Sequence, residues 1–147
     1  MTLLDPPAAK PEKSRAIPFT VAALTLAALV VLFFIFRYYP EKRAASHFFD
    51  ALVAGDTNHA YELWKPTSSY QMKDFLADWG PSGYYGPIKS YKIDRAKSPI
   101  GASGVAITVS ISPFSPLPEP GDAEKSRKTK TVVVWVDKSD KSFSFPP

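Results

Sequence analysis

Acidic and phenolic side chains are the residues of this sequence that could do acid–base chemistry. A carboxylate beside a phenol in an apolar pocket can move a proton, because burial raises the pKa of an acid. The side chains of this kind are Asp50, Asp74, Asp78, Tyr61, Tyr84, Tyr85 and Tyr91. The three aspartates fall outside the apolar stripes of the helices predicted around them, which favours exposed helix surface over catalysis. We therefore expect no catalytic residue.

Metal and cofactor chemistry has few ligands available. The chain has no Cys, which excludes disulfides, thiolate nucleophiles, zinc fingers and thiolate-bound iron–sulfur clusters. His47 and Asp50 are three residues apart and can share a helix face, and His59 is the other histidine. These ligands are too few for a closed metal site. We expect no metal and no cofactor.

Aromatic side chains are the better candidates for binding, because large aromatics dominate both ligand cavities and partner-binding hot spots. The candidate ligand or partner surface consists of Tyr61, Trp64, Trp79, Tyr84, Tyr85, Phe114 and Leu117. Trp64 and Trp79 stand at helical spacing, which favours core packing. Tyr84 and Tyr85 stand in a Gly/Pro turn, where a core role is harder to explain.

Residues 113–126 form a Pro-rich loop between two predicted strands. Loops of this length are uncommon between paired strands and are typically functional or disordered. The Pro spacing could present an extended, polyproline-like ligand with Phe114 and Leu117 as its anchors. The alternative is a mobile surface loop.

Basic residues gather towards the end of this loop. They are Lys125, Arg127, Lys128 and Lys130. Lysines protect strand edges from aggregation, and in a tethered protein they could also meet anionic lipid headgroups. The net charge of the chain is only +4, and a nucleic-acid module would concentrate far more charge. We expect no nucleic-acid partner.

One segment has the composition of a membrane span. Residues 16–36 contain no charge, and as a helix they would cover about 31 Å, which matches the ~30 Å hydrocarbon layer. We predict a transmembrane helix over residues 16–39, with Tyr38 and Tyr39 at the interface, after a disordered tail over residues 1–15. A cleaved signal peptide is the alternative, but bulky residues stand where its cleavage site needs small ones.

The expected orientation of this helix rests on the lengths of the chain segments before and after it. The basic residues that flank it nearly balance, so charge alone does not decide. A short tail followed by a long domain is typical of an uncleaved signal anchor. We expect a single-pass protein of the cell membrane, bound to the lipid bilayer through this anchor, with its C-terminal domain extracytoplasmic.

Helix-period patterns fill the first part of residues 41–147. Apolar residues at helical spacing predict a helix from Glu41 that ends at Gly55. A second helix is predicted over residues 58–65, capped by Asp56 or Thr57. A third is predicted over residues 69–79. Ser68 and Gln71 have the spacing of a capping box for this third helix.

Strand-like patterns follow. Strands are predicted over residues 88–95, 105–112 and 131–136, and a turn then leads into Phe143 and Phe145. Only residues 105–112 alternate strictly between apolar and polar positions, which indicates one buried face. Three helices followed by about four antiparallel strands indicate an α+β domain.

The segment AASHFFDALVAGDTNHAYELWKP and the ending VVVWVDKSDKSFSF resemble the opening and the last hairpin of small bacterial domains of the NTF2-like superfamily, the cystatin-like cone fold. The resemblance covers roughly residues 41–145, without an invariant motif. It implies a curved antiparallel sheet that wraps a long first helix and can leave an apolar cavity. Some members are isomerases or hydratases, and many are non-catalytic binding or accessory modules. No residue here aligns with a catalytic motif of the family.

Together these patterns favour a membrane-anchored, non-enzymatic binding or accessory module. Its expected partner is another membrane or envelope protein, as for an accessory subunit of an envelope complex. The alternative is a domain that binds a small apolar ligand in the cone cavity, or isomerises it. That alternative requires a pocket holding an Asp or Tyr with a shifted pKa.

Overall fold

The computed structural model describes residues 16–116 and 129–146, with side chains from Pro18 onwards. The chain divides into two compact units, residues 1–37 and residues 38–147, which are taken here one at a time. The predicted tail over residues 1–15, most of the Pro-rich loop, Leu117 and the basic residues Lys125, Arg127 and Lys128 lie outside the described residues.

The first unit is the apolar helix α1, Ala16–Phe36. It has 21 residues, or about 31 Å of helix, and is long and apolar enough to cross a membrane. Its described side chains are exposed around the whole circumference, so it has no buried face that would make it a core helix. The Thr25 hydroxyl donates to the Val21 carbonyl at 2.9 Å, which satisfies a polar group that lipid could not. The helix ends at Phe36, three residues before the predicted end.

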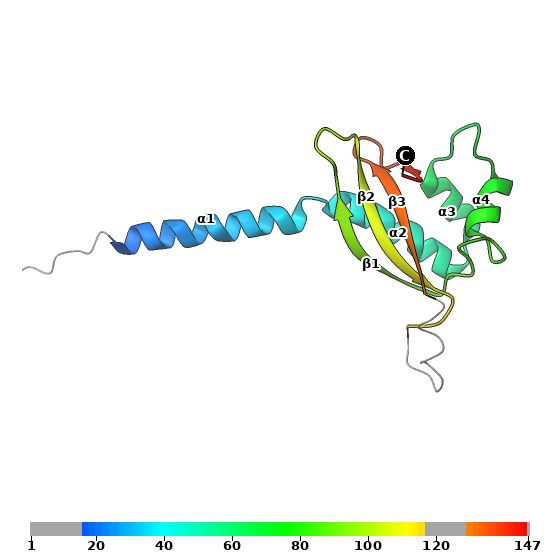
Figure 1. The fold of residues 1–147 in the computed structure, drawn as a ribbon, viewed down its shortest axis with the longest axis horizontal. Coiled ribbons are helices and arrows are strands. Elements are labelled where there is room, and N and C mark those ends of the chain that lie inside the picture. Colours follow the sequence, from blue (N-terminus) through cyan, green and yellow to red (C-terminus); the bar gives the residue numbers. More distant parts are fainter. Residues whose placement is uncertain (1–15, 117–128, 147) are drawn as a thin grey trace, which may run out of the picture. The chain divides into compact units, whose positions relative to one another are not determined.

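The second unit begins with three helices (Figure 1). These are α2 (Tyr39–Ala54), α3 (Thr57–Trp64) and α4 (Met72–Trp79). Gly55 ends α2 in the left-handed conformation with φ 77°, and the Asp56 side chain caps α3 by accepting the His59 N–H at 3.0 Å. Both ends agree with the spacing in the sequence.

The start of α4 corrects one prediction. The helix begins at Met72 and not at residue 69, and its first turn is capped by Asp74, whose carboxylate accepts the Gln71 N–H at 3.0 Å. The capping pair is therefore Gln71 and Asp74, not Ser68 and Gln71. The prediction failed because both pairs have the same spacing of three residues, and local spacing alone cannot choose between them.

Four antiparallel strands follow, in the order β1-β2-β3-β4. They are β1 (Ser90–Lys97), β2 (Gly104–Ser112), β3 (Lys130–Asp137) and the two-residue β4 (Phe143–Ser144). The predicted α+β order of three helices and then four antiparallel strands is confirmed. The first strand starts at Ser90, two residues later than predicted. Ile88 is buried, as its apolar side chain suggests, but the pairing with β2 begins only at Ser90.

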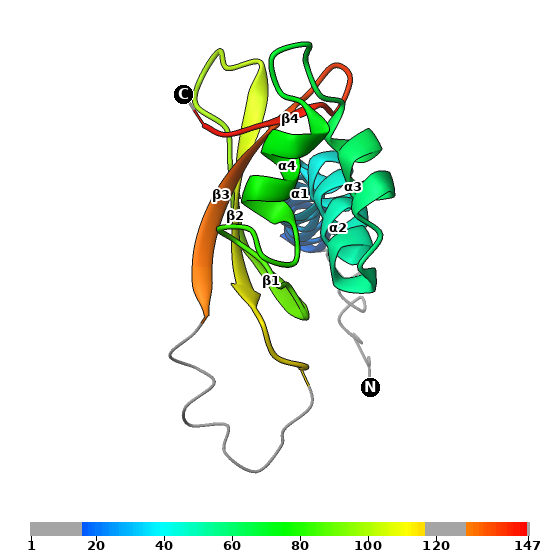
Figure 2. The same cartoon turned by 90° about the vertical axis from the view of Figure 1, so that its right-hand side faces the viewer.

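The sheet is curved, and the three helices lie against one of its faces (Figure 2). Side chains along a strand point alternately to the two faces of the sheet, so every second residue of β2 and β3 faces the helices. These buried residues are Val105, Ile107, Val109, Ile111, Val132, Val134 and Val136. Phe48 of α2 lies at the centre of the opposing layer. Its ring centroid is 5.3 Å from that of Trp64, 5.2 Å from that of Trp79 and 5.0 Å from that of Phe143. This aromatic cluster joins all three helices to the end of the sheet.

Candidate functional site

The loop between α4 and β1 places Tyr84 and Tyr85 side by side, and they are the part of the predicted surface that the fold makes accessible. The Tyr84 N–H donates to the Ala77 carbonyl at 2.9 Å, and the Tyr85 N–H donates to the Asp78 carbonyl at 2.8 Å. These bonds fold the loop back onto α4 and fix the two backbones. The two rings meet edge to face, with centroids 4.9 Å apart.

The two tyrosines have opposite environments. Tyr85 stacks on the buried Trp79, with centroids 4.7 Å apart and 26° between the planes. Tyr84 projects from the domain and is 70% exposed. Lys130, at the start of β3, donates from Nζ to the Tyr84 carbonyl at 2.6 Å, and its ammonium lies 5.0 Å from the centroid of the Tyr84 ring. Tyr84 is thus an exposed aromatic side chain on a fixed support.

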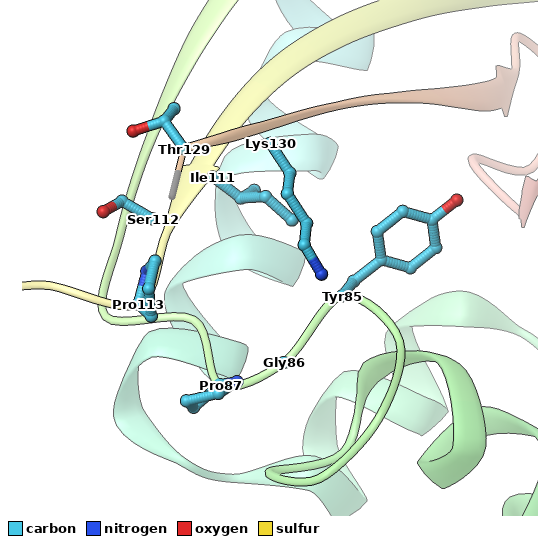
Figure 3. Close-up of a pocket in the computed structure, with 8 residues that line it drawn as sticks. All are labelled: Tyr85, Gly86, Pro87, Ile111, Ser112, Pro113, Thr129 and Lys130. Carbon is cyan, nitrogen blue, oxygen red and sulfur yellow. The ribbon is translucent and has the colours of Figure 1, made fainter. Parts of the chain in front are cut away.

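A pocket of about 500 Å³ opens beside this loop, at the end of the sheet where β2 finishes and β3 starts (Figure 3). The Lys130 side chain ends inside it, Ile111 lines it with apolar surface, and Tyr85 borders it with its hydroxyl directed away from the other labelled side chains. Its lining consists of Tyr85, Gly86, Pro87, Ile111, Ser112, Pro113, Thr129 and Lys130. The volume is that of a site for a small molecule.

The polar side-chain groups that line the pocket are the Tyr85, Ser112 and Thr129 hydroxyls and the Lys130 ammonium. Burial, followed by the neighbouring Tyr84 and Asp78, raises the pKa of Tyr85 above its ordinary value. The Tyr85 hydroxyl stays protonated at neutral pH. A ligand here would meet an apolar wall, neutral hydroxyls and one cation.

The remaining aromatic candidates lie elsewhere. Trp64 and Trp79 are core residues, 3% and 2% exposed, which agrees with their helical spacing. Tyr61 is half-buried and donates to the Tyr70 carbonyl at 3.1 Å, so it holds the connection between α3 and α4. Phe114 is half-buried after β2, and its carbonyl accepts a bond from the Ser90 hydroxyl at 2.7 Å. Of the predicted surface residues that the structure describes, only Tyr85 lines this pocket, and Tyr84 contacts the Tyr85 ring.

The acid–base candidates are used in structural bonds. The Tyr91 hydroxyl donates to Asp50 at 2.7 Å, and the Tyr70 hydroxyl donates to Asp78 at 2.7 Å. Burial, and then the bond to Asp50, raises the pKa of Tyr91 to about 12. Asp74 caps α4. Asp50 therefore joins α2 to β1, Asp78 joins α4 to the segment before it, and Asp74 caps its own helix.

The histidines stand on exposed surface. His47 lies on α2, and His59, in the first turn of α3, is 3.9 Å from Glu62. Within residues 16–116 and 129–146, no three His, Asp or Glu side chains are grouped as they would be around a metal ion.

Sequence reasoning missed Ile111, Pro87 and Pro113 as pocket residues. These residues come from separate segments, and only the pairing of β1 with β2, which places Ser90 opposite Ser112, brings them together. The alternation of residues 105–112 predicts that Ile111 is buried, which is correct. This pattern does not reveal that the strand ends at a pocket. No family model matches this chain, and neither a curated protein nor a solved structure matches it, so its own geometry defines the site.

Proposed function

We propose that this chain is a single-pass bacterial membrane protein whose C-terminal domain is a non-enzymatic binding or accessory module for another protein of the membrane or envelope. The observation that carries the proposal is Tyr84, an exposed ring held on a fixed loop. Tyrosine is among the residues that contribute most to protein interfaces. Because the loop is already fixed by backbone bonds, docking on Tyr84 would order little new chain.

Three further features support the proposal. The apolar helix α1 is of membrane-spanning length, which fits a tethered module. The long helix α2, packed across a curved four-stranded sheet, fits an NTF2-like domain, and we retain that assignment as part of the proposal (Figure 2). The aspartates considered for catalysis accept structural hydrogen bonds.

The experiment is site-specific photo-crosslinking in native membranes. The full-length chain would carry benzoylphenylalanine at position 84, with a matched variant at Asn58, which is exposed on α3. We expect position 84 to form a defined adduct with one membrane protein and position 58 to form none. Equal labelling from both positions, or no adduct from either, would contradict the proposal.

The same complex can be tested by truncation. Losing a hot-spot side chain costs about 2 kcal/mol or more, so Tyr84→Ala is expected to weaken the complex roughly 30-fold, whereas Asn58→Ala leaves it unchanged. Tyr84 is exposed, so its loss leaves the core intact. The measurement is the amount of partner that co-purifies with each variant in mild detergent.

A second candidate function is binding of a small apolar molecule, or its isomerisation, and the pocket beside Tyr85 favours it. Its volume of about 500 Å³, its Ile111 wall and the Lys130 ammonium suit an apolar molecule with one carbonyl oxygen. Ile111→Phe adds bulk to this wall and is expected to displace such a ligand. Native mass spectrometry would show an added mass on the wild-type chain that the variant lacks, and a wild-type chain of bare mass would exclude this candidate.

A further inference from the structure

Ile100, at the tip of the β1–β2 loop, is the most exposed large apolar side chain among the described residues. Its exposed fraction is 106%, so nothing in the described part of the chain covers it. It stands between Pro99 and Gly101, and Gly101 has a φ of 75°. A branched apolar side chain at the tip of a turn is unfavourable in water, and its burial in an apolar environment would be favourable.

This loop lies at the same end of the domain as the first turn of α2 (Figure 1). Lys138, in the β3–β4 turn, donates from Nζ to the Ala102 carbonyl and from its backbone N–H to the Ser103 carbonyl, both at 2.8 Å. Lys141, in the same turn, pairs through Nζ with the buried Glu41 of α2 at 2.9 Å. We call these three segments, residues 38–43, 97–103 and 137–141, the anchor-side end.

The covalent chain keeps this end close to the end of α1. The helix α1 ends at Phe36, and only Arg37 separates it from the second unit, which starts at Tyr38. Because each residue spans at most ~3.6 Å, the start of α2 stays within roughly 10 Å of the end of α1 in any orientation of the two units. If α1 spans a bilayer, the start of α2 therefore lies near the headgroups in any orientation of the domain.

Basic side chains outnumber acidic ones at this end by five to three. Within the described part of the chain, Lys97, Arg43 and Lys42 form no ion pair with an acidic side chain, whereas the one acidic side chain of the first turn, Glu41, is buried and paired with Lys141. Asp137 and Asp140 accept the backbone N–H groups of Ser139 and Ser142. An open hollow of about 420 Å³ also lies here, lined by Tyr39, Pro40, Arg43, Ala44, His47 and Lys141.

We propose that the anchor-side end is a membrane-contact surface, in which Ile100 enters the headgroup layer of an anionic bilayer while Lys97 and Arg43 contact lipid phosphates. The inference rests on the proposed membrane anchoring by α1. Basic residues are attracted to an anionic membrane surface, and an apolar side chain that enters the interface adds its own burial. These contacts would hold the domain in one orientation on the membrane.

The test uses the full-length chain in lipid nanodiscs. Because the chain has no Cys, Ile100→Cys and the control Asn58→Cys each provide a single site for an NBD fluorophore. Asn58 follows the C-terminal end of α2, which is the opposite end from Tyr39. In discs with doxyl-labelled lipid and about a third phosphatidylglycerol, we expect strong quenching and a blue shift at position 100 and neither at position 58. Equal quenching at the two positions would overturn the proposal.

The contact with anionic lipid is tested with a matched pair of lysine variants. Lys97 ends β1 and Lys89 precedes it, so the two charges are roughly 25 Å apart, about three Debye lengths at physiological salt. We expect Lys97→Glu to reduce the quenching at position 100 in anionic discs and Lys89→Glu to leave it unchanged. Quenching that is equal in anionic and phosphatidylcholine discs would contradict the contact with anionic lipid.

Failure of the anchor and failure of this inference give different results. A chain that does not enter the discs would contradict the proposed anchoring by α1. A chain that enters the discs but leaves position 100 unquenched would overturn only the membrane-contact surface.

Discussion

At the scale of single residues, hydroxyl–carboxylate bonds connect the layers of the domain. Tyr91 of β1 stacks on Phe49, with ring centroids 5.3 Å apart, and its hydroxyl reaches Asp50 on the same helix at 2.7 Å. Tyr91→Phe keeps the ring and removes the bond. Because Asp50 is exposed, we expect a loss of about 1 kcal/mol in the free energy of unfolding, measured by urea titration of the solubilised chain with tryptophan fluorescence.

The contribution of this bond depends on pH in a defined direction. The pKa of Tyr91 is raised from 10.0 to about 12 by burial and by the bond to Asp50. Between these values the unfolded chain loses the proton first, so the stability that the hydroxyl provides is complete below pH 10 and disappears as the pH rises towards 12. The difference between wild type and Tyr91→Phe should therefore be constant from pH 7 to 9 and narrow above pH 10. A difference that stays constant up to pH 12 would contradict the assignment.

At the scale of elements, the end of α2 sets where the next helix starts. Gly55 has φ 77°, and the N–H groups of Gly55 and Asp56 donate to the Leu52 and Ala51 carbonyls at 3.1 and 2.9 Å. A Cβ at Gly55 would meet no atom within 4 Å, so substitution there changes backbone strain alone. We expect Gly55→Ala to cost about 1–2 kcal/mol and Gly55→Asn clearly less, since Asn tolerates this conformation. Equal stability of the two variants by urea titration would contradict this account.

Elements with a strong local signal are the ones that the sequence predicts correctly. The alternation of β2 and the helical period of α2 agree with the observed burial of Ile107, Val109, Phe48 and Phe49, because periodicity depends directly on which face is covered. The start of α4 and the first residue of β1 depend on tertiary partners. The segment before α4 is held by the bond from Tyr61 to the Tyr70 carbonyl, which no local pattern encodes.

The candidate site was predictable in part for the same reason. Tyr84 and Tyr85 were recognisable because aromatic residues in a Gly/Pro turn lack a helical or strand period that would bury them. The pocket beside them was not, because its walls belong to the α4–β1 loop and to the ends of β2 and β3. Such a site forms only when the strands have paired in their register. A single sequence therefore shows which residue types are available but not which of them lie together.

At the scale of the whole molecule, the chain combines a helix without a buried face and a domain with a dense aromatic core. If the helix spans a membrane, the side on which the domain lies decides which partners it can bind. We propose that the domain lies outside the cytoplasm, and labelling of a single introduced thiol tests this topology. Because the chain has no Cys, Asn58→Cys introduces the only thiol, on exposed helix surface. We expect an impermeant maleimide to label it in intact spheroplasts to the same extent as after lysis. A second variant, Lys89→Cys, serves as an independent exposed site in the same domain and should give the same result. Labelling of both sites only after lysis would place the domain in the cytoplasm, and the partner of Tyr84 would then have to be sought on that side.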